Sequence, residues 1–85
     1  MAAGKTTIMI EKFAYTTPAS VSPGATVEVM NMDGSAHTVT ADSGNAFDVK
    51  ATPGKTVTFT APTEPGTYDF HCTYHSNMHG TLVVK

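Results

Sequence analysis

The chain has 85 residues, of which 40% are hydrophobic and 14% charged, and its formal net charge is −2. This composition is too apolar for a disordered chain. The absence of arginine and of any basic cluster argues against nucleic-acid binding. No run approaches the roughly 20 apolar residues of a membrane span, so we expect one small globular domain, residues 1–85, without a membrane span.

Short segments in which apolar and polar residues alternate recur along the chain, separated by turn signals such as Asp33-Gly34. The segments that we expect to form strands are, in chain order, Thr6–Ile10, Thr26–Met30, His37–Thr40, Ala46–Val49, Thr56–Thr60, Thr67–Cys72 and Thr81–Val84. Residues 42–55 are the least strand-like part and predict a long loop or an irregular edge strand. No stretch of ten or more residues has helical spacing. The sequence therefore predicts an all-β sandwich of about seven to eight strands.

The segment Phe70–Gly80 contains most of the side chains that could bind a metal: one thiol, three imidazoles and one thioether. Cys72, His75 and Met78 follow one another at intervals of three, and Cys72 ends the inward face of its strand. His37 comes from a different strand, after a turn-prone stretch. One thiolate, two imidazoles and one thioether suit copper that cycles between Cu(I) and Cu(II), in a trigonal His2Cys site with a weak axial Met.

Each of these residues also has a purely structural interpretation. Cys72 alone would be a small buried hydrophobe and Met78 a core filler, while His37 alone would be a surface or core histidine. Alternation along the strand points His71 away from Cys72, so a surface role is expected for it. His79 is expected near the rim of the site without touching copper.

Several segments resemble the cupredoxin family, the type 1 blue copper proteins. The segments that carry the resemblance are Ser22–Val29, Ala36–Val39, Gly66–Cys72 and the Cys-x2-His-x2-Met loop, whose short spacing is similar to that of amicyanin rather than plastocyanin. The resemblance implies a Greek-key β-sandwich that carries single electrons between redox partners and is not an enzyme. It also implies one copper ion per chain, with His37, Cys72, His75 and Met78 as its ligands.

The same resemblance implies how partners would bind. Redox proteins would dock transiently at an apolar surface around the exposed edge of His75, formed by Ala36, Met32 and Met78. We expect a monomer that is periplasmic or otherwise exported, although residues 1–5 lack the apolar core of a signal peptide.

Two positions depart from the family pattern. Thr38 stands where amicyanin-type proteins have Asn, and a hydrogen bond between Thr38 and Thr73 would replace the tie that this Asn makes between the ligand loops. Tyr74 stands where they have Pro, so its backbone N–H is available to the Cys72 sulfur.

Other functions remain open from the sequence alone. The chain could be a copper carrier or storage module, or a cupredoxin domain excised from a larger copper enzyme. An adhesive β-sandwich would require the spacing of Cys72, His75 and Met78 to be a coincidence. An enzyme is disfavoured because four protein ligands leave no open position on the metal.

Overall fold

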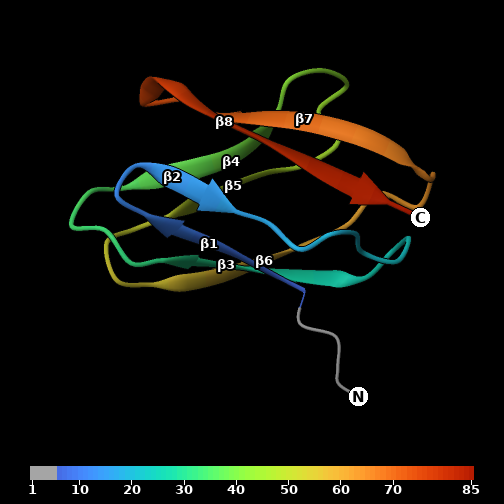
Figure 1. The fold of residues 1–85 in the computed structure, drawn as a ribbon, viewed down its shortest axis with the longest axis horizontal. Helices are drawn as coiled ribbons and strands as arrows, with labels where there is room; N and C mark the ends of the chain where they lie inside the picture. The colour runs from blue at the N-terminus through green and yellow to red at the C-terminus, as the bar shows by residue number, and fades with distance from the viewer. Residues whose placement is uncertain (1–5) are drawn as a thin grey trace.

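The computed structural model describes residues 6–85, apart from the side chain of Ser76, as two four-stranded β-sheets packed face to face (Figure 1). The strands are β1 (Thr7–Glu11), β2 (Ala14–Thr16), β3 (Thr26–Asn31), β4 (His37–Ala41), β5 (Asp48–Ala51), β6 (Thr56–Thr60), β7 (Gly66–Cys72) and β8 (His75–Val84). Residues 1–5 are part of the expected domain, and the remark on a signal peptide rests on them, but they lie outside the described residues. The predicted all-β sandwich is confirmed.

One sheet has the strand order β2-β1-β3-β6 and the other the order β5-β4-β7-β8. Strands β1 and β3 are parallel, and the other strand pairs are antiparallel. The chain passes from one sheet to the other between β3 and β4, between β5 and β6, and again between β6 and β7. Within residues 6–85 we find no helix with the length and hydropathy that a membrane span needs.

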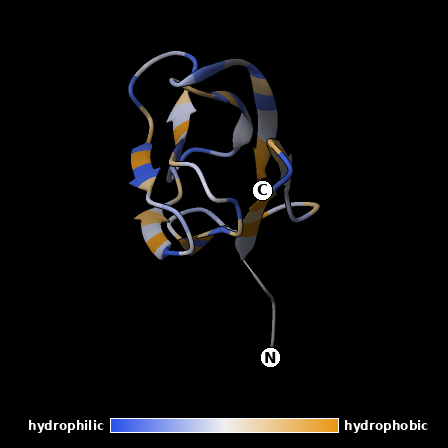
Figure 2. Ribbon diagram, turned by 90° about the vertical axis from the view of Figure 1, so that its left-hand side faces the viewer, coloured by the Kyte–Doolittle hydropathy of each residue, from blue (hydrophilic) through white to orange (hydrophobic). Residues whose placement is uncertain are grey.

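The inward residues of each strand form one core between the sheets, which the alternating colours along the strands of Figure 2 reflect. Phe70 lies at its centre without any exposure, with the ring of Tyr15 at 4.7 Å and the ring of Phe47 at 6.1 Å between centroids. A Cβ atom on Gly80 would lie only 2.5 Å from Cζ of Phe70. Glycine is therefore needed at position 80 so that β8 can pack against this ring.

The largest differences from the expected strands concern β5, β8 and β2. β5 begins two residues later than predicted, because Phe47 turns into the core and stacks on Phe59 with ring centroids 4.8 Å apart. β8 begins at His75 instead of position 81, because its pairing with β7 continues beyond Gly80 and, after an irregularity between His71 and Cys72, reaches His75 opposite Cys72. The three-residue strand β2 was not predicted, since it is too short for a visible alternation.

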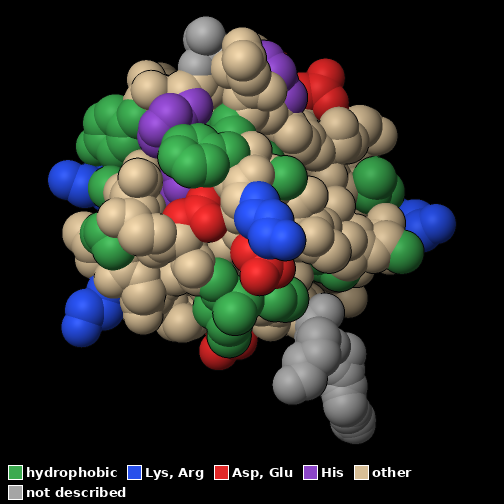
Figure 3. Space-filling view, turned by 60° about the vertical axis from the view of Figure 1, so that its left-hand side comes forward, with side chains coloured by type: hydrophobic (Ala, Val, Ile, Leu, Met, Phe, Trp, Pro, Cys, Tyr) green, Lys and Arg blue, Asp and Glu red, His purple; other side chains and the backbone are tan. Residues whose placement is uncertain are grey.

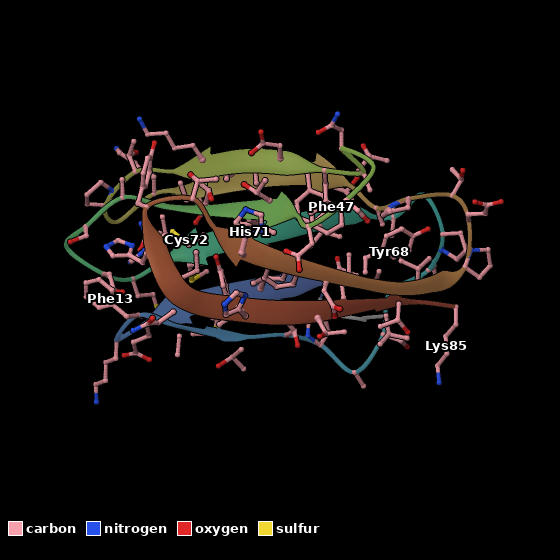
Figure 4. The ribbon with its side chains drawn as sticks, turned by 90° about the horizontal axis from the view of Figure 1, so that it is seen from above. Phe13, Phe47, Tyr68, His71, Cys72 and Lys85 are labelled. Carbon is pink, nitrogen blue, oxygen red and sulfur yellow. The ribbon has the colours of Figure 1, made fainter. Side chains whose placement is uncertain are left out.

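Three connections meet at one end of the sandwich: the β1–β2 turn, the β3–β4 loop and the β7–β8 connection, all at the left in Figure 1. Viewed from above in Figure 4, Phe13 and Cys72 lie at this end, and Tyr68 and Lys85 lie at the other. The chemically distinctive residues of the sequence are therefore collected at a single end of the fold.

Candidate metal centre

Three of the four predicted ligands meet at this end. His37 begins β4, Cys72 ends β7 and His75 begins β8. One donor atom from each lies within 4.8 Å of the others. Cys72 Sγ lies 3.8 Å from Nδ1 of His37 and 3.5 Å from Nδ1 of His75. The fold thus brings Cys72 and His75, which are close in the sequence, together with His37, which lies 35 residues before Cys72.

These distances fit a metal ion bound between the donors. Bonds of about 2.3 Å to sulfur and about 2.0 Å to nitrogen, at tetrahedral to trigonal angles, place sulfur and nitrogen about 3.5–3.8 Å apart. The observed separations are 3.5 and 3.8 Å. His37 and Cys72 are buried and His75 is partly exposed, so the donors form a largely dry site that suits a soft or borderline ion such as copper.

Met78, the fourth predicted ligand, is 2% exposed. It lines a hollow at the end of the sandwich together with Phe13, Tyr74, His75 and Asn77. Its burial beside His75 is compatible with an axial position. Its assignment as a ligand stays a prediction.

Asp33, which the sequence analysis did not single out, holds His37 from the side opposite to Cys72. Its Oδ2 atom lies 2.8 Å from Nε2 of His37. This contact places the imidazole proton on Nε2 and leaves the lone pair of Nδ1 directed at the site. The carboxylate also accepts the backbone N–H groups of Lys12 and Phe13, at 2.7 and 3.0 Å.

Asp33 remains ionised at neutral pH. The N–H of Phe13 is the main cause that holds the pKa of this carboxyl below its usual value; burial opposes it, and the N–H of Lys12 and the contact with His37 add to the lowering. Lys12 and Phe13 have φ angles of 55° and 60°, in the left-handed region that non-glycine residues rarely adopt. The two N–H bonds to Asp33 stabilise this strained turn.

Thr38 links the two ligand-bearing segments. Its backbone N–H points at Cys72 Sγ, 3.4 Å away, and its Oγ1 accepts the backbone N–H of Thr73 at 2.9 Å. The predicted hydrogen bond between Thr38 and Thr73 is confirmed. The sulfur receives the N–H of Thr38, and the bond from the N–H of Tyr74 to the same sulfur stays a prediction.

Tyr15 supports the same strand from the other sheet. Its hydroxyl donates to the carbonyl oxygen of Thr38. Burial, followed by the nearby Cys72 thiol group, raises the pKa of Tyr15 above its usual value. The phenol therefore stays protonated and keeps its role as a donor across the neutral range.

Phe13, on the strained β1–β2 turn, covers the histidines with its ring. It meets His37 and His75 edge to face, with centroid distances of 5.1 and 4.8 Å, and is itself 51% exposed. The sequence gives only a weak signal for it, an aromatic residue in a polar turn. Figure 3 shows histidine and hydrophobic side chains side by side on this end of the surface.

The expected apolar surface differs in composition from the prediction. Met32 is exposed as expected, at 52%, but Met78 is buried and contributes almost nothing to the surface. Phe13 and Tyr74, which are about half exposed, flank His75 around the hollow. His71 and His79 do not line the hollow at His75, and His71 is paired with Asp42 on the outer face of its sheet.

Comparison with known proteins points to one family. The family described as Cupredoxin-like domain matches residues 4–84. Amicyanin from Paracoccus denitrificans is 34% identical over 93 aligned residues, covering 100% of this chain and 69% of that protein. A reduced Cu(I) form of an amicyanin variant at pH 4 has a TM-score of 0.79 at 33% identity, covering 100% of this chain and 86% of that chain. An oxidised amicyanin variant has a TM-score of 0.81 at 33% identity, covering 99% and 85%.

Proposed function

This chain belongs to the cupredoxin-like family, and we propose from this premise that it is a type 1 (blue) copper protein that carries single electrons between redox partners. The observation that carries the proposal is the convergence of one thiol sulfur and two imidazole nitrogens within 4.8 Å at one end of the sandwich. Bound copper supplies one-electron chemistry by cycling between Cu(I) and Cu(II). We further propose that residues 1–85 form a single domain with one such site.

The proposed ligands are His37, Cys72, His75 and Met78. Cys72 would supply a strong thiolate bond to the copper and Met78 a weaker thioether contact. His37 is fixed from behind by Asp33 Oδ2, at 2.8 Å from its Nε2, and Cys72 is fixed by the N–H of Thr38. Ligands that hydrogen bonds hold in place move little when an electron arrives or leaves, which favours rapid transfer.

The four side chains have no evident role in hydrolysis or group transfer. Four protein ligands leave no open position for a substrate, so the proposed role is that of a carrier and not of an enzyme.

Partner proteins would dock at the end of the sandwich where His75 is partly exposed. Phe13, Met32 and Tyr74 are each about half exposed there or close by, and they offer apolar contact area without a strong charge. An interface of this kind, burying about 1,200 Å² or less, suits transient redox encounters. We propose a monomer that works in the periplasm or another exported location.

A copper carrier or storage module is the second candidate, because the same donor set binds Cu(I) well. The two candidates differ in what leaves the protein. An electron carrier cycles through many oxidations and reductions with its copper retained, whereas a copper carrier hands Cu(I) to a chelator rapidly. Repeated cycling in the presence of a Cu(I) chelator separates them.

The first test is titration of the metal-free protein with Cu(II), followed by visible absorption. We expect an intense blue thiolate-to-copper band that stops growing at one copper per chain and is absent in Cys72→Ser. Thr73→Ser, at the exposed neighbouring position, is the matched control and should keep the band. A pale tetragonal copper signal in the unaltered protein would contradict the proposed His2Cys site.

A further inference from the structure

The outer face of the β5-β4-β7-β8 sheet carries a pair of histidine side chains apart from the His37, Cys72 and His75 centre. His71 on β7 and His79 on β8 are direct cross-strand partners. Partners of this kind project from the same face with Cβ atoms about 5 Å apart. Alternation places them opposite to Phe70 and Cys72, which point into the core. Figure 4 looks down on this outer face, where His71 is labelled.

Asp42, directly after β4, completes the group from a third segment. Its Oδ1 atom lies 2.6 Å from Nδ1 of His71, and its backbone N–H donates to the carbonyl of Asp69 at 2.9 Å. The carboxylate thus holds Nδ1 of His71 as the protonated nitrogen and leaves the lone pair of Nε2 free. A histidine oriented in this way by a carboxylate is the usual arrangement behind a metal ligand.

The surface is hollowed at these side chains. One hollow is lined by Asp42, His71 and His79, with Cys72, Thr73 and Tyr74 beyond them. An adjoining hollow shares Asp42 and His79 with the first and adds Asp69, whose carboxylate accepts the hydroxyl of Thr81 at 2.9 Å. Two imidazoles therefore face a shallow basin bordered by two acidic side chains, where a cation is favoured electrostatically.

We propose that His71 and His79 form a second metal site, separate from the His37, Cys72 and His75 centre, that binds a divalent transition-metal ion such as Zn²⁺ or Cu²⁺. Nε2 of His71 and one ring nitrogen of His79 are the ligands. His79 is exposed, so its ring is free to turn toward its partner. Asp42 is a positioning residue, and water completes the coordination. Imidazole nitrogen with oxygen donors is the set that these ions accept, with Cu²⁺ preferred over Zn²⁺.

The site is tested with Zn²⁺ added to the copper-loaded protein, in which the first centre is already filled. Calorimetry should show one Zn²⁺ ion bound per chain while the blue band is unchanged. His71→Gln and His79→Gln, on two different strands, should each weaken Zn²⁺ binding by at least tenfold. Asp42→Asn should weaken it by about 10- to 100-fold, as the loss of an orienting carboxylate does in other metal sites.

Asp48→Asn is the matched control. Asp48 pairs with Thr40, which pairs with His71, so it lies on the same face but on β5, three strands away from His79. It removes one negative charge without touching the basin, so Zn²⁺ binding should change by less than threefold. The proposal is overturned if the copper-loaded protein binds no Zn²⁺ at millimolar concentration. It is also overturned if either histidine variant binds Zn²⁺ normally, or if Asp48→Asn weakens binding as much as they do.

The proposed function and this second site fail in different ways. If no blue band forms, the electron-transfer proposal is lost, while Zn²⁺ uptake that depends on His79 but not on Cys72 still supports the second site. If the blue band forms and Zn²⁺ uptake ignores both histidines, only the second site is lost.

Discussion

Replacement of Asp33 by alanine should destabilise the metal-free protein by about 3 kcal/mol. The carboxylate accepts two backbone N–H groups at 2.7 and 3.0 Å and contacts Nε2 of His37 at 2.8 Å. Hydrogen bonds to a charged group contribute about 1.5–3 kcal/mol each, and water replaces part of this at the exposed turn. The left-handed conformations of Lys12 and Phe13 cost about 1–2 kcal/mol per residue, and without Asp33 the turn loses both hydrogen bonds that offset this strain.

Urea unfolding of the metal-free chain measures this loss, and the midpoint should fall while the slope stays the same. Asp33→Asn keeps an oxygen acceptor without the charge and should lose about half as much stability. Asp69→Ala is the matched control, because its carboxylate accepts one exposed hydroxyl, and it should cost less than about 1 kcal/mol.

A second measurement separates the turn from the histidine. The ¹⁵N chemical shifts of the imidazole of His37 should report a protonated Nε2 in the unaltered protein and a mixture of tautomers in Asp33→Ala. Copper affinity should fall by about 10- to 100-fold, since this carboxylate orients a ligand. The reasoning is refuted if Asp33→Ala unfolds within about 0.5 kcal/mol of the unaltered chain and keeps a single tautomer.

Three further substitutions test the support of the site. Gly80→Ala should lower the free energy of unfolding in urea by about 1–3 kcal/mol, because the added Cβ would lie 2.5 Å from the buried ring of Phe70. Gly34→Ala is the control: no atom lies within 4 Å of its added Cβ, so the free energy of unfolding should change by less than about 0.5 kcal/mol. Equal effects of the two substitutions would contradict the packing argument. Thr38→Val keeps the shape of the side chain but leaves the backbone N–H of Thr73 without its acceptor. The free energy of unfolding should therefore fall by about 1–2 kcal/mol. An unchanged urea midpoint would show that water replaces the bond. Tyr15→Phe should cost about 1 kcal/mol at neutral pH, since the hydroxyl donates to a carbonyl. Because the pKa of Tyr15 is raised in the folded state, the stability that its hydroxyl contributes is present below about pH 10, the usual pKa of tyrosine, and is lost as the pH rises above that value. If the stabilities of the unaltered protein and of Tyr15→Phe stay parallel into alkaline solution, this argument is contradicted.

The sequence alone was sufficient to predict the strands in which apolar and polar residues alternate regularly. In Thr56–Thr60 the predicted and observed bounds agree, and Val27 and Val29 face the core as their spacing requires. It was insufficient where packing overrides the local pattern. Phe47 enters the core from a loop and shifts β5, which no period-two argument anticipates, because the partner ring comes from the other sheet.

The candidate metal centre likewise has a part that the sequence predicted and a part that it did not. The spacing of Cys72, His75 and Met78 is a local property of one loop, so the sequence alone indicates a metal-binding segment and the kind of ion that suits it. The contacts of Asp33 and Phe13 with the histidines are not local. They depend on a turn in which two non-glycine residues adopt positive φ angles, and neither residue belongs to a recognised motif.

By itself, then, the amino-acid sequence determined the strand periodicity, the inward face of β7 and the donor atoms available to a metal. The resemblance to the cupredoxin family also predicted that His37 joins Cys72 from 35 residues away, and the structure brings the two side chains to 3.8 Å. Only the tertiary structure decided that Asp33 fixes the tautomer of His37 and that His71 faces His79 across β7 and β8. The physical reason is that spacing in the sequence reports which residues share a face within one strand. The register between strands and the packing between sheets result from the burial of the whole core, and they decide which faces meet.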